Sequence, residues 1–165
     1  MSIAIRDALP SDADAICAIY NHHVRETIVT FEEVDVTAED MRGRIAQVTP
    51  VLPWLVAEKD GDVAGYAYAG RFIDRSGYRF CALSSVYVDE AARRCGLGTA
   101  LYSALLERLR LKSIHSVVGI IALPNPASIA LHEKCGFKKA GHLTEAGYKF
   151  GRWIDAGYWQ ALLSP

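Results

Sequence analysis

The sequence predicts one domain that mixes helices and strands, an α+β or mixed α/β fold. Two runs with strand character, residues 54–58 and 63–69, flank the tight-turn signal Asp60-Gly61 and form a predicted hairpin. Strand and helix signals then alternate in the second half of the chain, which favours a sheet covered by helices. The length of 165 residues is that of one domain, so we expect residues 1–165 to fold as a single unit.

The composition excludes several classes of protein. Hydrophobic residues make up 51% of the chain and charged residues 22%, which argues against disorder. The 18 Lys and Arg residues nearly balance the 19 Asp and Glu residues, so we expect no general attraction to nucleic acid or to an anionic membrane. The sequence shows no secretory leader pattern and no apolar run long enough to span a bilayer. We therefore expect a cytoplasmic protein.

The four cysteines, Cys17, Cys81, Cys95 and Cys135, lie far apart and form no C-x-x-C pair. Metal-ligand spacing is missing, so we expect no metal site. In a cytoplasmic protein we expect these thiols to be reduced and mostly buried, with a disulfide as the less favoured alternative.

Capping residues mark the helices. Ser11 is placed to cap a first helix and Thr37 a second one, which ends at Thr49-Pro50. Gly136 is expected to end a short helix over residues 127–134.

Periodicity predicts the other elements. They are strands at residues 3–8, 82–88, 116–123, 137–143 and 153–162, and a helix at residues 99–111. We expect the strand at 116–123 to be fully buried. We expect the last two strands to be joined by a loop that contains Gly147 and Gly151.

A basic turn that contains glycines lies between a predicted core strand and the helix at residues 99–111. Its residues are Arg93, Arg94, Cys95, Gly96, Leu97, Gly98 and Thr99. Glycines let the backbone approach a ligand closely, and the first turn of a helix offers unpaired N–H groups at the positive end of the macrodipole. These features predict a pyrophosphate site, to which Arg93 and Arg94 would add charge-assisted hydrogen bonds. The alternative is a glycine turn with two solvated arginines.

Two further candidate sites follow from single residues. His132 lies two helical turns beyond Asn125, which is placed to cap the helix, and imidazole suits proton transfer near neutral pH. A half-buried structural histidine is the alternative. Arg75, in the loop at residues 71–78, could bind a carboxylate or phosphinate with two hydrogen bonds, or it could be a solvated loop residue.

In this order along the chain, these residues resemble the GNAT superfamily of N-acetyltransferases. The family pattern Gln/Arg-x-x-Gly-x-Gly/Ala is matched by the residues from Arg93 to Gly98. The sequence is similar in particular to the phosphinothricin N-acetyltransferase group, over residues 3–160. The segments that carry this likeness are 20–23, 30–31, 53–58, 65–70, 85–88, 125–132 and 147–153.

The resemblance implies a mixed, mostly antiparallel sheet of about seven strands, splayed between the fourth and fifth, with flanking helices. Acetyl-CoA, as co-substrate, would lie in the splay, its pantetheine arm along the strand at Val86, Tyr87 and Val88. Its pyrophosphate would lie on the turn at residues 93–99, with Asn125 and Ser128 on the other side of the cofactor. An amine would attack the thioester directly in a ternary complex, and His132 would protonate the leaving thiolate.

The resemblance also implies an acceptor. The group acetylates the α-amino group of glutamate-like compounds such as phosphinothricin, methionine sulfoximine and methionine sulfone. The residues that would line the acceptor pocket are Phe31, Arg75, Tyr78, Leu83, Ser84, Ser85 and Lys149. A homodimer is implied as well, and two-fold dimers are the commonest oligomers.

The sequence departs from this group at Leu83, where a glutamate is usually the general base. Leucine cannot accept the proton that an α-ammonium must lose before it attacks. The group also often has a basic residue where Ile73 stands. Water and backbone carbonyls could relay the proton, or Glu26 or Glu32 could replace the base.

Two other functions stay open because of Leu83. The acceptor could differ, as another amino acid, a polyamine or a peptide N-terminus. The protein could also be an acetyl-CoA-binding sensor with little turnover.

Overall fold

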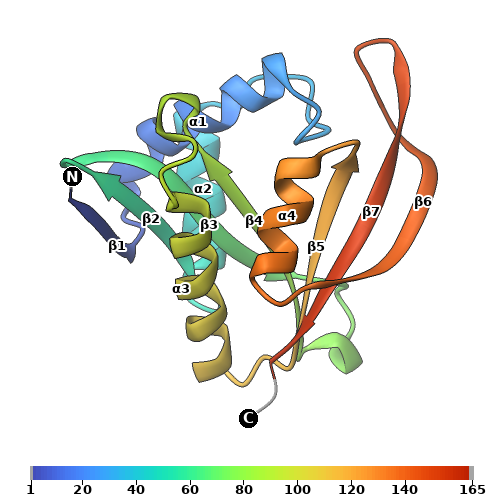
Figure 1. Ribbon diagram of the computed structural model, residues 1–165. Coiled ribbons are helices and arrows are strands. Elements are labelled where there is room, and N and C mark those ends of the chain that lie inside the picture. The colour runs from blue at the N-terminus through green and yellow to red at the C-terminus, as the bar shows by residue number, and fades with distance from the viewer. Residues whose placement is uncertain (1, 164–165) are drawn as a thin grey trace.

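The computed structural model describes residues 2–163 and shows a seven-stranded mixed sheet with helices on both faces (Figure 1). The strand order is β1-β2-β3-β4-β5-β7-β6. The strands are β1 (Ile3–Asp7), β2 (Trp54–Lys59), β3 (Asp62–Arg71), β4 (Cys81–Val88), β5 (Ser116–Leu123), β6 (Lys138–Lys149) and β7 (Arg152–Leu162). The α-helices are α1 (Ala13–Glu26), α2 (Ala38–Val48), α3 (Leu97–Leu111) and α4 (Pro126–Lys134), and the 3-10 helices are η1 (Pro10–Asp12), η2 (Ser76–Tyr78) and η3 (Glu90–Ala92). The fold class expected from the sequence is confirmed.

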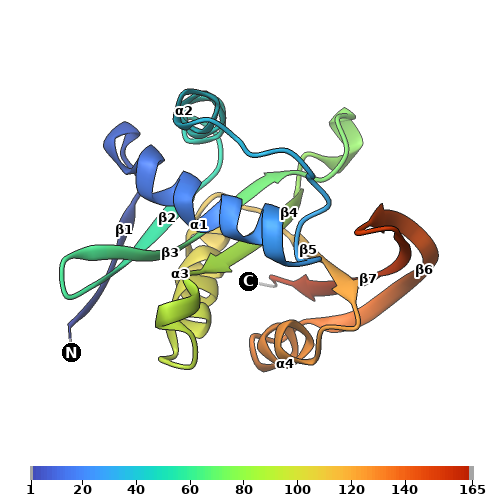
Figure 2. The same ribbon diagram turned by 90° about the horizontal axis from the view of Figure 1, so that it is seen from above.

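The helices form a layer on each side of the sheet. α1 and α2 cover one face, and α3 and α4 cover the other (Figure 2). Because side chains alternate along a strand, the strands β2, β3 and β4 contribute to both hydrophobic cores. In β2, Leu55 and Ala57 pack in the core beneath α3, whereas Trp54 and Val56 pack in the core beneath α1 and α2.

The predicted hairpin is β2–β3, and the predicted Thr37 cap is present, since its hydroxyl accepts a hydrogen bond from the Asp40 amide at 3.1 Å. The expectation for Ser11 is wrong, because residues 10–12 form η1 and α1 begins at Ala13. Asp12, and not Ser11, is the residue that directly precedes α1, and its side chain bonds to residues that come before it in the chain. It accepts hydrogen bonds from the Leu9 amide at 2.7 Å and from both terminal nitrogens of the Arg6 guanidinium.

Three other sequence expectations need correction. α3 begins at Leu97, two residues earlier than predicted. Gly147 lies inside β6, because β6 and β7 form one long, curved hairpin whose turn is Phe150-Gly151 (Figure 1). β5 is not fully buried, since the side chain of Ile120 is 42% exposed.

The exposure of Ile120 reflects a splay between the two central strands. β4 and β5 pair in parallel only where residues Cys81–Ser84 face residues Ser116–Gly119. Beyond this point β4 remains paired with β3, and β5 remains paired with β7, but no pairing joins β4 to β5. The splay expected between the fourth and fifth strands is therefore present, and backbone groups of residues 85–88 face the opening.

Within residues 2–163, every helix is too short or too polar to cross a bilayer.

Candidate active site

The glycine turn offers backbone donors at the mouth of the splay. Gly96 has φ of +80° and precedes the first residue of α3, and Arg94 also has a positive φ, of +63°. Among the described residues, no protein group accepts a hydrogen bond from the amides of residues 94–99. Free amides at the positive end of a 15-residue helix fit a pyrophosphate.

The side chains around this turn leave it open. Arg94 is exposed, and Arg93 lies 3.8 Å from the Glu90 carboxylate at the surface. The ammonium of Lys59 donates to the Cys95 sulfur at 3.7 Å. A Cβ on Gly98 would lie 3.2 Å from the Leu131 side chain, so a glycine here allows α4 to pack close to the turn.

The open edge of β4 lies next to the turn. Val86 and Val88 pack towards the core beneath α3, and Tyr87 packs on the opposite face against Tyr20 and Tyr66, with 5.2 Å between ring centroids in each pair. Burial raises the pKa of Tyr87 well above its ordinary value, so the phenol stays neutral. This packing holds the strand on both faces, and its main chain remains free on the side facing β5 to pair with an extended ligand.

A chain of three hydrogen-bonded side chains sits where β4 and β5 separate. The Tyr102 hydroxyl lies 2.7 Å from the Ser84 hydroxyl and 2.9 Å from Nε2 of His132. His132 is 96% buried, since its exposed fraction is 4%. Its Nδ1 lies 2.7 Å from the Ser128 carbonyl oxygen, which can only accept, so Nδ1 carries the proton and Nε2 accepts from Tyr102.

The surroundings keep His132 neutral. Burial lowers the pKa of His132, although the bond to the Ser128 carbonyl raises it in part. Burial also raises the pKa of Tyr102, so its hydroxyl keeps its proton. A Cβ on Gly119 would lie 2.4 Å from His132 Nε2, so the imidazole rests directly on the backbone of β5.

Asn125 and Ser128, which were predicted to face the cofactor, also stabilise α4 and its histidine. The Asn125 side chain caps α4 by accepting from the Ser128 amide at 3.1 Å. Ser128 in turn supplies the carbonyl that fixes His132. Both residues lie at the amino end of α4. This end follows the last residue of β5, whereas β5 pairs with β4 only over its first four residues.

The residues predicted to line the acceptor pocket are divided between the two faces of the sheet. Ser84 points to the α3 face and bonds Tyr102, so it does not share a face with its neighbours. Strand alternation places Leu83 and Ser85 on the α1 face, together with Tyr87. The expectation that Leu83, Ser84 and Ser85 all line one acceptor pocket is therefore wrong for Ser84, whose side chain lies on the opposite face of the sheet.

Phe31 and Lys149 meet at the upper end of the sheet. A Cβ on Gly147 would lie 2.4 Å from the Phe31 ring, so the ring lies flat against β6. The ammonium of Lys149 is buried and donates to three backbone carbonyls, which leaves no donor for a substrate. Its predicted role as a direct acceptor contact is therefore wrong.

Arg75 and Tyr78 lie at the other end of the sheet. Arg75 caps η2 and Tyr78 is its last residue, and η2 lies shortly before β4, whereas Phe31 contacts Gly147 near the β6–β7 turn. Figure 1 shows that turn at the opposite end of the sheet from η2. β5 connects these ends, and its eight residues span roughly 23 Å. The structure therefore does not bring Arg75 and Phe31 together within one chain.

Neither glutamate considered as a replacement base is free at the site and poised for proton transfer. Burial alone would raise the pKa of Glu32, but hydrogen bonds from Arg44 and Tyr20 lower it overall. Arg44 holds this carboxylate with two contacts, at 2.7 and 3.1 Å. Glu26 is exposed at the end of α1.

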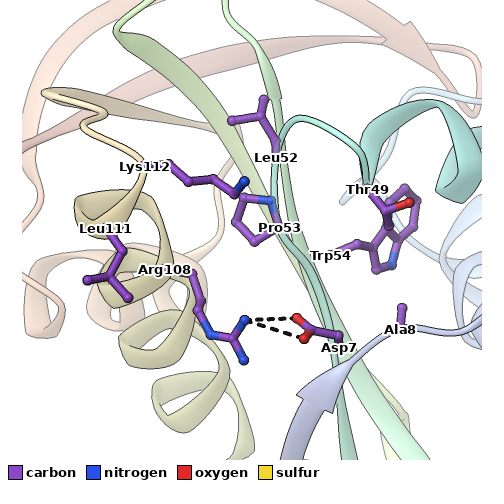
Figure 3. Close-up of a pocket in the computed structure, with 9 residues that line it drawn as sticks. All are labelled: Asp7, Ala8, Thr49, Leu52, Pro53, Trp54, Arg108, Leu111 and Lys112. Carbon is purple, nitrogen blue, oxygen red and sulfur yellow. Dashed lines mark hydrogen bonds and ion pairs between the residues drawn. The ribbon is translucent and has the colours of Figure 1, made fainter.

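Hollows occur on both sides of this region. One of about 550 Å³ lies on the α1 face of the sheet between β5, β6 and the loop before β4, and its lining includes Tyr78, Val118 and Tyr158. Val118 is the register partner of Leu83, so this hollow lies beside the position of the missing base. Another cavity, of about 350 Å³, lies at the carboxyl end of α3, where Arg108 and Asp7 pair at 3.1 Å (Figure 3). It is at the opposite end of α3 from the glycine turn and plays no part in the site.

The fold and site define an acetyltransferase of a particular kind. A splayed sheet, an open β4 edge and a helix amino end with free amides form a site for an extended thioester with a pyrophosphate. Among the described residues, no cluster of His, Cys, Asp and Glu side chains has the geometry of a metal site. The family Acetyltransferase (GNAT) domain matches residues 5–157. The chain belongs to the GNAT family of acetyltransferases, and acetyl-CoA is its acetyl donor.

Two curated relatives and one solved structure show which members of the GNAT family this chain is similar to. The chain is 40% identical to a phosphinothricin N-acetyltransferase of Streptomyces viridochromogenes, over 96% of this chain and 86% of the relative. It is 38% identical to an L-methionine sulfoximine/L-methionine sulfone acetyltransferase of Pseudomonas aeruginosa, over 100% of this chain and 97% of the relative. A phosphinothricin acetyltransferase of Sinorhizobium meliloti, solved in complex with acetyl-CoA, superposes with a TM-score of 0.96 at 36% identity, covering 99% of this chain and 90% of that one. These findings confirm the predicted family and the predicted N-acetyltransferase activity.

Sequence reasoning missed two residues of the site. Tyr102 falls on the apolar stripe of α3 and is indistinguishable there from a core residue. Gly119 carried a usable signal, because a glycine inside an apolar strand often marks a close approach by another group.

Proposed function

We propose that this protein transfers the acetyl group of acetyl-CoA to the α-amino group of small amino-acid-like acceptors, of the phosphinothricin and methionine sulfoximine or sulfone type. The observation that carries this proposal is the set of unpaired amides at residues 94–99 beside the open edge of β4. The names and full-length coverage of the relatives support the acceptor class.

The reaction is a direct transfer in a ternary complex. The pantetheine arm pairs with residues 86–88, the pyrophosphate lies on the turn at residues 93–99, and the acetyl group reaches the point where β4 and β5 separate. The neutral amine forms a bond to the carbonyl carbon, and the carbon–sulfur bond then breaks. The nitrogen loses a proton and the leaving thiolate gains one, so positioning is the main resource of the site.

We assign the thiolate proton to the pair of Tyr102 and His132. His132 Nε2 carries no proton in the resting state, whereas the Tyr102 hydroxyl does. When the Tyr102 hydroxyl gives its proton to the thiolate, the Ser84 hydroxyl can donate a hydrogen bond to the resulting phenolate, and a proton from solvent then restores the phenol. In this proposal His132 is a positioning residue that orients the Tyr102 hydroxyl, in place of the direct proton donor implied by the resemblance.

The amine proton leaves without a carboxylate at position 83. Leu83 and Ser85 face the acceptor side of β4, and Glu32 is held by Arg44. We propose that water hydrogen-bonded to Ser85 and to free backbone groups relays this proton to solvent. Loss of a general base costs about 10² to 10⁴ in rate, so acceptors that are partly deprotonated at neutral pH are favoured.

We propose that the protein is a homodimer in the cytoplasm. Exposed apolar side chains gather around the loop before β4, at Ile73, Tyr78 and Phe80. In a two-fold dimer this loop would bring Arg75 of one copy towards the other copy. Arg75 could then take part in acceptor binding in the other copy, although it is far from Phe31 of its own copy. The four cysteines are free thiols, which is compatible with a reducing compartment. The expectation that they are mostly buried is wrong, because only Cys17 is buried and the other three are partly exposed.

The test is release of CoA from acetyl-CoA by purified protein with phosphinothricin, methionine sulfoximine, methionine sulfone and a panel of other amines. We expect acceptor-dependent CoA release with at least one of the first three. No release with any amine, despite bound acetyl-CoA, would reject the enzyme and favour a sensor. Release only with a polyamine or a peptide N-terminus would reject the acceptor class alone.

The second candidate, an acetyl-CoA sensor, rests on Leu83. The variant Leu83→Glu separates the two, with Leu83→Gln as the matched polar control that cannot act as a base. A large rise in kcat at neutral pH for Leu83→Glu alone indicates an enzyme that works with a weakened proton route. Tight acetyl-CoA binding with no turnover in either variant indicates a sensor.

A further inference from the structure

Lys149 is a buried ammonium that bridges distant segments of the chain. It lies near the end of β6, its exposed fraction is 1%, and its three N–H groups donate to three carbonyl oxygens. The acceptors are His23 at 3.3 Å, Thr27 at 2.8 Å and Thr30 at 2.8 Å. None of these hydrogen-bond partners is a side chain, although the ammonium also lies 5.0 Å from the centroid of the Phe150 ring.

The position of the ammonium explains why a charge is tolerated there. The carbonyls of His23 and Thr27 belong to the last turn and the cap of α1, where the macrodipole is negative, and the His23 carbonyl also accepts from the Thr27 amide at 3.2 Å. A cation at this end satisfies those carbonyls and is attracted by the dipole. Burial lowers the pKa of Lys149, and the nearby Glu33 carboxylate raises it in part.

A second contact joins the same two segments. The Phe31 ring lies against the backbone of Gly147, where a Cβ would come within 2.4 Å of the ring. Residues 27–31 are therefore fixed to β6 at both ends, by the ammonium and by the ring. Figure 2 shows this loop between β4 and the curved β6–β7 hairpin.

The loop has separate anchors on α1. The Tyr20 hydroxyl lies 2.8 Å from the Thr30 hydroxyl, and the Asn21 amide bonds both the N–H and the carbonyl of Val36 at 2.8 Å. Loss of Lys149 would therefore leave the loop attached to α1. It would release the β6–β7 hairpin from residues 27–31. The distance between these two segments on the acceptor side would change, and the glycine turn at residues 93–99 would stay as it is.

We infer that Lys149 is a positioning residue that sets the separation between residues 27–31 and the β6–β7 hairpin, and so the shape of the acceptor entrance. This inference rests on the proposed function for its kinetic consequence only. It replaces the direct acceptor contact expected from the sequence with an indirect role through Thr27, Thr30 and Phe31.

The test compares Lys149→Met, Lys149→Arg and a control, Lys139→Met, which removes an exposed ammonium from the same strand. For Lys149→Met we expect the acceptor KM to rise at least tenfold and the acetyl-CoA KM to stay within twofold. Lys149→Arg should recover part of the acceptor KM because it keeps the donors. Lys139→Met should match the wild type. Equal acceptor KM values in Lys149→Met and wild type would overturn the inference.

A second readout does not depend on activity. Amide hydrogen exchange in residues 27–31 and 148–151 should accelerate at least tenfold in Lys149→Met, with no change in residues 94–99. Unchanged exchange in both segments would reject the positioning role even if the protein transferred no acetyl group. If Lys149→Met does not fold, Lys149→Arg carries the test, since an unchanged acceptor KM and unchanged exchange in a variant with altered donor geometry would overturn the inference. Gly147→Ala tests the second contact separately, because its Cβ must displace Phe31 while the ammonium stays in place.

Discussion

His132 and Tyr102 act as one unit because their hydrogen bonds leave a single arrangement of protons. The Ser128 carbonyl requires a donor at Nδ1 of His132, and this leaves Nε2 as an acceptor for the Tyr102 hydroxyl. An alanine at position 132 offers no acceptor, and a glutamine offers an amide that does not titrate. Removal of His132 should therefore also release the Tyr102 hydroxyl.

The variant His132→Gln should lower kcat about 10²-fold, as expected for loss of a proton-transfer group. The acetyl-CoA KM should stay within twofold, because the amides of residues 94–99 are unchanged. Steady-state kinetics with both substrates varied gives the two values. Tyr66→Phe is a suitable control, since it removes a buried phenol hydroxyl from the opposite core. A kcat equal to that of wild type would remove His132 from the mechanism.

Buried neutral histidines also make stability depend on pH. Burial lowers the pKa of both His23 and His132 in the folded state. In the unfolded state each binds a proton below its ordinary pKa of about 6.5, so the unfolded state binds more protons than the folded one. The free energy of unfolding should therefore fall as pH drops below about 6.5.

Urea unfolding at pH 7.5 and at pH 5.5 measures this effect. We expect a lower midpoint at pH 5.5 in wild type, and a smaller difference between the two pH values in His132→Gln. A midpoint that is the same at both pH values would contradict neutral burial.

At the scale of elements, the close approach of α4 to β5 depends on Gly119. The imidazole of α4 rests where a side chain would otherwise stand, next to the register partner Ser84. Neither element can shift alone, because β5 is fixed by pairing with β7 and α4 is capped by Asn125. This explains why the hydrogen-bonded chain forms at the point where the strands separate.

The variant Gly119→Ala should cost about 1–3 kcal/mol of stability, as is typical of overpacking, and should lower kcat by displacing His132. Gly70→Ala is the stability control, because a Cβ there meets nothing within 4 Å. Denaturant unfolding and kcat should be measured on both variants. Wild-type values for Gly119→Ala would show that the imidazole is not confined by β5.

At the scale of the molecule, the splay divides the sheet into two halves that are paired only over four residues of each central strand. In the proposed complex, acetyl-CoA in the opening would contact β4 and α3 on one side and α4 on the other. A ligand that binds only the folded state stabilises it by about 2.7 kcal/mol at 100 times its Kd. For a chain of this size, that corresponds to a rise in Tm of about 5–10 °C.

Thermal unfolding with and without acetyl-CoA tests this prediction. Gly96→Ala should abolish most of the rise, because φ of +80° strains a side chain and distorts the turn. Gly61→Ala is the matched control. It places the same strain, at φ of +98°, in the β2–β3 turn and should keep the full rise. An equal loss of the rise in both variants would show that the turn does not hold the cofactor.

Much of the fold could be predicted because the signals are local. The Asp60-Gly61 turn, the Thr37 cap and the C′ glycine Gly136 each specify a conformation through their own backbone or side chain. The candidate site could be predicted in the same way only where all its groups lie in one short segment, as in the turn that precedes α3. Ser11 was misassigned because Asp12 has a stronger, distant partner in Arg6.

The sequence by itself therefore determined the family, the strand and helix order and the position of the glycine turn before α3, since glycine geometry and helix amino ends are properties of short segments. Only the tertiary structure decided the roles of Ser84, Tyr102 and Lys149. The partners of these three residues lie 18 or more positions away in the chain. Whether such a side chain binds a substrate or a neighbour depends on which distant groups the fold places within hydrogen-bond reach, and no local pattern contains that information.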